Sequence, residues 1–229
     1  MSLSIQTTGY GTISRPAERA ILRINIKHDG PDRTIVSKNV FQCTQRVREI
    51  LEPMSDKLSS GEPSPSAAIT QWSMGALDTY SYPNYDTDGK ITGRTHHAAT
   101  SFEANFQDFG KLADVASELS AMEFVNLDGV EWRLTDVTKG ALASEVRALA
   151  AKDGLARAED YARALGWEKV RPVDLEEQRG VDDGSFGGRV HRMCMMAGGD
   201  GDGGDPGLSF QPEEVRLETV VTVKSVADK

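Results

Sequence analysis

The sequence predicts an α+β fold in which antiparallel sheets pack against two long helices. Three observations predict it. Apolar and polar residues alternate over 20–27, which is typical of a half-buried strand, and the segment over 215–226 is expected to close the chain as another strand. Apolar residues recur every three or four positions over 36–54, and small residues do so over 138–165, which indicates two long helices. The order of these segments forms two loosely similar β-α-β-β halves.

In the first half we expect a strand over 4–13, which contains two glycines, and a second strand over 20–27. Asp32 is the predicted N-cap of the helix over 36–54. The apolar stripe of this helix is Val36, Val40, Cys43, Val47, Ile50 and Met54. A Ser/Pro-rich linker over 59–66 precedes strands over 67–77 and 92–106, which a turn over 82–90 joins.

In the second half we expect a short helix over 109–122, an extended segment over 123–135 and the long helix over 138–165. The inner face of the short helix is Leu112, Val115, Ala116 and Leu119. The stripe of the long helix is Ala141, Ser144, Ala148, Ala151, Leu155, Ala158, Ala162 and Leu165. Because these side chains are small, the helix is expected to lie close against a sheet. Gly166 is its expected C-terminal cap, and strands over 169–177 and 215–226 flank a flexible loop over 180–211.

The composition limits the classes of partner. The chain has 229 residues, enough for a single domain over 1–229, and a formal net charge of −9. An acidic chain is a poor nucleic-acid binder, because phosphate affinity needs clustered Lys and Arg. No segment approaches the ~18 apolar residues of a membrane helix. The first residues do not form a signal peptide, so the cytoplasm is the expected location.

Five stretches that cover nearly the whole chain carry a family resemblance. They are the opening glycine strand with Pro16 and AILRINI, the helix over 36–54, TYSYPNY followed by ATSFEANFQDFGKLADVASEL, ALASEVRALAAKDGLARAEDYARALGWEKVRPVDLEE, and FQPEEVRLETVVTVKSV. Together they resemble the SIMPL domain (domain of unknown function 541). They mark a fold and contain no catalytic signature. The family's frequent Pro-Asp before the second strand is Pro16-Ala17-Glu18 here.

The resemblance implies an interaction or assembly protein and supplies no active site. An animal member is similar to a signalling partner of a kinase, and some bacterial members form ring-like assemblies linked to oxidative stress. Bacterial relatives usually carry a leader peptide, which we do not find here, so their periplasmic role is not carried over.

A cluster of soft side chains is the sharpest candidate site. His191, Met193, Cys194, Met195 and Met196 lie within six positions. Thioethers and a thiolate suit Cu(I), so the cluster could hold a soft metal or respond to oxidation. The alternative is an apolar strand end, or a subunit contact through Met193, Met195 and Met196. A structural disulfide between Cys43 and Cys194 is not expected, because cytosolic thiols stay reduced.

Two other motifs follow this cluster. Asp200, Asp202 and Asp205 could form an irregular calcium site, although a solvated loop explains them too. The glycines over 199–204 match G-x-G-x-x-G, but the aspartates would repel a phosphate and no helix can follow Pro206.

The remaining candidates are aromatic or histidine residues. His96 and His97 are adjacent on an expected strand, so they should point to opposite faces, share no metal and be exposed. Tyr80, Tyr82, Tyr85 and Asp86 could belong to an unrecognised enzyme, but turn chemistry explains them equally well.

We therefore expect a non-enzymatic SIMPL protein that needs no cofactor and acts through self-assembly or protein–protein interaction. A homo-oligomer and further protein partners are expected, whereas nucleic acid and membranes are not. The alternative is a copper-binding or redox-responsive protein that uses the cluster over 191–196.

Overall fold

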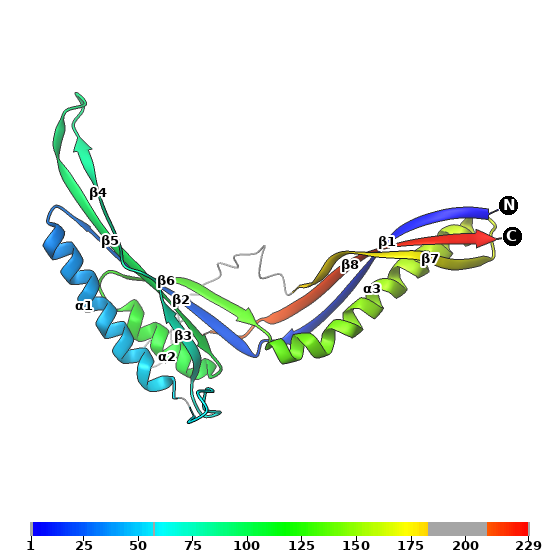
Figure 1. Ribbon diagram of the computed structural model, residues 1–229, viewed down its shortest axis with the longest axis horizontal. Coiled ribbons are helices and arrows are strands. Elements are labelled where there is room, and N and C mark those ends of the chain that lie inside the picture. The colour runs from blue at the N-terminus through cyan, green and yellow to red at the C-terminus, as the bar shows by residue number, and fades with distance from the viewer. Residues whose placement is uncertain (1, 57, 183–209, 229) are drawn as a thin grey trace, which may run out of the picture. The chain divides into compact units, whose positions relative to one another are not determined.

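The computed structural model describes residues 2–56, 58–182 and 210–228, which form two compact units (Figure 1). The first unit contains residues 2–18, 132–182 and 213–228. The second contains residues 19–131 and 210–212, so it is inserted between parts of the first in the order of the chain. The helices and antiparallel sheets confirm the predicted α+β class.

The first unit is a three-stranded antiparallel sheet covered by one long helix (Figure 1). Strand β8 (Glu214–Asp228) lies between β1 (Ser2–Pro16) and β7 (Lys169–Asp182), and helix α3 (Asp136–Ala164) packs on the sheet. Both β1 and β8 are strands, as predicted, and alternate residues of each are buried. Strand β7 is longer than expected, because its last residues pair with β8 inside the segment predicted to be a loop.

Helix α3 lies unusually close to β1, as its small side chains predict. A Cβ atom added to Gly9 would lie 2.1 Å from the carbonyl oxygen of Ala150, so only glycine fits beneath the helix. The hydroxyl of Thr7 donates a hydrogen bond of 2.7 Å to the carbonyl oxygen of Gly154. Two backbones in direct contact therefore replace the usual layer of large side chains between sheet and helix.

The face of α3 that meets the sheet differs from the predicted stripe. Its buried residues are Val146, Ala150, Gly154, Ala158 and Ala162. Of the predicted residues, Ala141, Ser144, Ala148 and Leu165 are exposed, and Ala151 and Leu155 are half-buried. The prediction was right for Ala158 and Ala162 and wrong for the other six residues. Alanine is common all around this helix, so its spacing marks no single face. The glycine at the closest contact carries no hydrophobic signal at all.

The second unit is a five-stranded sheet with two helices (Figure 1). The order is β3 (Ile69–Met74), β5 (Ile91–Phe106), β2 (Arg19–Gly30) and β6 (Val125–Arg133). Strand β4 (Asp78–Tyr85) also pairs with β5, beyond the part that pairs with β3. Helices α1 (Arg33–Leu51) and α2 (Phe109–Ser120) pack on β2 and β5. Alternate residues of these two strands are buried.

The helix predictions for this unit are largely confirmed. The carboxylate of Asp32 accepts hydrogen bonds from the backbone N–H groups of Thr34 and Ile35, as an N-cap should. All four residues predicted for the inner face of α2 are buried. In α1, Thr44 and Leu51 are buried, whereas Cys43 and Ile50 are only half-buried. A 3₁₀ turn, η1 (Glu52–Met54), follows α1.

Strand β4 was not predicted as a strand. The expected turn over 82–90 begins only at Asp86, whose carboxylate accepts the N–H groups of Asp88 and Lys90. Residues 82–85 pair with β5 although Pro83 lies among them. An edge strand tolerates proline, because a missing backbone N–H costs no hydrogen bond on the side where no neighbouring strand pairs.

No helix in the described part of the chain is both long and apolar enough to cross a membrane.

Candidate functional site

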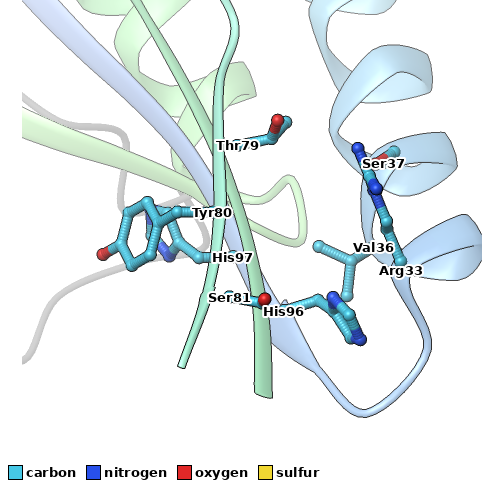
Figure 2. Close-up of a pocket in the computed structure, with 8 residues that line it drawn as sticks. All are labelled: Arg33, Val36, Ser37, Thr79, Tyr80, Ser81, His96 and His97. Carbon is cyan, nitrogen blue, oxygen red and sulfur yellow. The ribbon is translucent and has the colours of Figure 1, made fainter. Parts of the chain in front are cut away.

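The strands β4 and β5 present side chains of different chemistry on their two sides. Tyr80 pairs with His97, and Ser81 pairs with His96. Successive residues of a strand point to opposite faces. Tyr80 and His97 therefore lie on one side, and Ser81 and His96 lie on the side that faces α1 (Figure 2). This confirms that the two histidines point apart, but both are half-buried instead of exposed.

The side away from α1 carries a cluster that we call the tyrosine face, defined by Tyr80, Tyr82 and His97. The rings of Tyr80 and His97 stack with centroids 4.5 Å apart, and those of Tyr80 and Tyr82 lie 6.3 Å apart. The Nδ1 atom of His97 lies 2.7 Å from a carboxylate oxygen of Asp29 on β2. This hydrogen bond holds the imidazole in place, and the imidazole in turn supports the ring of Tyr80.

The side toward α1 contains an open hollow of about 180 Å³. Its polar lining comes from three elements: the start of α1, strand β4 and strand β5 (Figure 2). The lining residues are Arg33, Val36, Ser37, Thr79, Tyr80, Ser81, His96 and His97. Tyr80 and His97 border the hollow, although their rings lie on the other side of the strands (Figure 2). The guanidinium of Arg94, two residues before His96, donates a hydrogen bond of 3.2 Å to the hydroxyl of Ser81.

Other candidate residues have structural roles. Asp86 holds the turn between β4 and β5. His28 stacks on Phe124 with ring centroids 4.2 Å apart, and its Nδ1 atom lies 3.3 Å from the side-chain nitrogen Nδ2 of Asn39. Each of these contacts fixes a turn or a helix against the sheet, so none indicates catalysis.

Cys43 is partly enclosed. Its thiol lies against the carbonyl oxygen of Glu123 at 3.1 Å and donates to it. Burial raises the pKa of the Cys43 thiol, and the negative charge of Glu123 raises it further. A thiol with a raised pKa is a poor nucleophile near neutral pH. Cys43 is therefore a packing residue of α1.

The cluster His191, Met193, Cys194, Met195 and Met196 lies outside the described residues, as do the three aspartates over 200–205. Among residues 2–56, 58–182 and 210–228, no three His, Cys, Asp or Glu residues are placed to hold a metal ion. Sequence reasoning missed the hollow, since it joins residues up to 64 positions apart (from 33 to 97). The alternation over 79–82 was the available signal for β4.

The profile of the SIMPL family, described as proteins of unknown function (DUF541), matches residues 5–225. This chain belongs to the SIMPL family. The match extends over residues of both units, which confirms the resemblance noted in the sequence. No curated protein matches the sequence.

Two solved structures share a little of the SIMPL chain's geometry. One is a putative amidohydrolase/peptidase from Burkholderia cenocepacia, with 12% identity, 63% of this chain and 35% of that chain covered, and a TM-score of 0.24. The other is a hydantoinase/carbamoylase family amidase from Burkholderia ambifaria, with 14% identity, coverages of 67% and 34%, and a TM-score of 0.20. The SIMPL chain thus spans about a third of their length, and such low scores say nothing about its activity.

Proposed function

We propose that this SIMPL protein is not an enzyme and acts by binding protein chains, in the first place a second copy of itself. The observation that carries the proposal is an edge strand with exposed tyrosines. β4 pairs with β5 on one side, and no strand in the described part of the chain pairs with its other side. Free strand edges are the sites at which sheets extend into a partner.

The exposed side chains of β4 suit a protein contact. Tyr80, Tyr82 and Tyr85 are 53%, 44% and 62% exposed, and Ile91 at the start of β5 is 60% exposed. Tyrosine is enriched in interfaces, because its ring buries a large area at low entropic cost and its hydroxyl stays hydrogen-bonded. A solvated strand with no partner would more often expose charged residues.

The sequence of β4 is complementary to itself. If two copies pair antiparallel about a two-fold axis through Ser81, Tyr80 of each copy lies opposite Tyr82 of the other. Directly opposed aromatic pairs contribute roughly 0.2–1 kcal/mol each. Both pairs would lie on the tyrosine face, next to His97. Pro83 has no N–H group to donate, so the row of hydrogen bonds between the two copies of β4 would be short, which favours a reversible contact.

Cysteine cross-linking tests this register. In a background with Cys43→Ala and Cys194→Ala, Ser81→Cys should form a disulfide-linked dimer under mild oxidation, because opposed Cβ atoms lie about 5 Å apart. Thr79→Cys is the matched control. Thr79 would face Pro83 of the second copy, so the two Thr79 residues would be about 13 Å apart and could not link. Equal cross-linking of both variants would contradict the register.

The mass in solution tests the contact itself. Light scattering should find a dimer or larger assembly for the wild-type chain and a smaller species for Tyr80→Ser with Tyr82→Ser. Tyr161→Ser, at a residue that is 61% exposed on α3, should leave the mass unchanged. A wild-type monomer at all concentrations would overturn the proposal.

The contact expected at Met193, Met195 and Met196 is a separate prediction. Replacing all three with serine should lower the measured mass if this segment takes part in assembly. The cytoplasmic location expected from the sequence is likewise still a prediction.

A further inference from the structure

The hollow between α1 and the strands β4 and β5 is a second candidate site, on the opposite side of β4 from the tyrosine face (Figure 2). We infer that it binds a phosphate group, either as inorganic phosphate or as a small phosphomonoester. The inference does not depend on self-assembly, since it uses the side chains that face α1 and not those of the tyrosine face.

The hollow carries positively charged side chains in an acidic protein. The whole chain has a formal net charge of −9, yet Arg33 and the imidazole of His96 line the hollow. A second guanidinium, that of Arg94, does not line the hollow but donates a hydrogen bond to the lining residue Ser81. Within the part of the chain that the structure describes, neither guanidinium forms an ion pair with a carboxylate, and Arg94 is bonded only to the hydroxyl of Ser81. With no carboxylate partner among the described residues, both guanidinium groups are available to an anion.

Two carboxylates that come shortly before Arg33 in the sequence are already engaged. Asp32 accepts two backbone N–H groups at the start of α1. Asp29 bonds to His97, which points to the other side of the sheet. Since Asp32 already accepts the N–H groups of Thr34 and Ile35, the proposed site uses side chains and not the end of the helix.

The lining of the hollow combines a guanidinium group with hydroxyl groups. Arg33 and Ser37 come from successive turns of α1, and Thr79 and Ser81 come from β4. Guanidinium groups bind phosphate through paired, charge-assisted hydrogen bonds, and hydroxyls donate to the remaining oxygens. The volume of about 180 Å³ is smaller than the roughly 300–1,000 Å³ of pockets for drug-sized ligands. A phosphate group fits this size, whereas a nucleotide would extend well outside it.

A titration of the full chain with inorganic phosphate, followed by NMR, tests the inference. At constant ionic strength we expect saturable shifts of the His96 ring protons and of the Ser37 amide, with a dissociation constant of about 1–10 mM. Phenyl phosphate in a parallel titration distinguishes a phosphomonoester from the free ion as the preferred ligand. Acetate is the control for a general effect of anions.

Matched variants on the same helix complete the test. Arg33→Gln should weaken phosphate binding about tenfold, as expected for the loss of a charged hydrogen-bond donor. His96→Asn should also weaken it, with the Ser37 amide as the reporter. Arg46→Gln removes an exposed arginine of α1 that does not line the hollow and should leave binding unchanged. The inference is overturned if shifts stay linear in phosphate, if acetate acts equally well, or if Arg46→Gln weakens binding as much as Arg33→Gln.

Discussion

The close contact between β1 and α3 leads to a strong prediction about glycine. A Cβ atom at position 11 would lie 2.0 Å from the carbonyl oxygen of Val146 and 2.8 Å from the backbone nitrogen of Ala150. Ordinary contacts between such atoms are 3.4 Å or longer. In Gly11→Ala the helix must therefore retreat by more than 1 Å, because the obstacle is backbone and cannot rotate away.

The size of the effect follows from what this retreat breaks. Overpacking of a core costs about 1–3 kcal/mol and occasionally more. Here the retreat also lengthens the bond from Thr7 to Gly154 and opens the layer over Ala158 and Ala162. We expect Gly11→Ala to lower the free energy of unfolding by about 3 kcal/mol, from the 5–15 kcal/mol of a typical protein.

Gly140→Ala is the matched control. Gly140 is an exposed residue of α3, and a Cβ atom there meets nothing within 4 Å. Alanine at a free helical position should stabilise the protein by about 0.5–1 kcal/mol. Urea unfolding followed by circular dichroism would measure both changes. If α3 did not lie so close to Gly11, alanine would stabilise the strand there as well. An unchanged or raised free energy of unfolding of Gly11→Ala would therefore refute the reasoning.

Two further predictions concern other contacts. The carboxylate of Glu18 accepts hydrogen bonds from the N–H and hydroxyl of Thr135 and from the hydroxyl of Thr138; Glu18→Gln should lower the free energy of unfolding by about 2 kcal/mol, and an unchanged urea midpoint would contradict this. Since burial raises the pKa of the Cys43 thiol, this thiol should react with a disulfide reagent at pH 8 more slowly in the folded than in the unfolded Cys194→Ser chain. Equal reaction rates in the folded and unfolded chains would refute this prediction. A group whose pKa is higher in the folded than in the unfolded state stabilises the fold below its unfolded pKa, so the contribution of Cys43 to stability should be lost as the pH rises through the folded pKa.

Local patterns were sufficient wherever one residue's neighbours in sequence decide its role. The cap at Asp32 depends only on the N–H groups two and three residues later, and it is found as predicted. The buried face of α2 is likewise as predicted, because its apolar residues lie on one side only. The same holds for the alternation in β2, where Ala20, Leu22, Ile24 and Ile26 are all buried as predicted.

By itself, the sequence determined the α+β class, most helices and strands, and membership of the SIMPL family. Tertiary structure alone decided which face of α3 is buried, since alanines surround that helix and the closest contact is made by a glycine. It also decided that residues 82–85 extend a strand, because β5 supplies the hydrogen bonds that local turn propensity cannot. The pairing of His97 with Asp29, 68 residues away, and the hollow at Arg33 depend on chain segments that meet only after folding, so no local pattern records them.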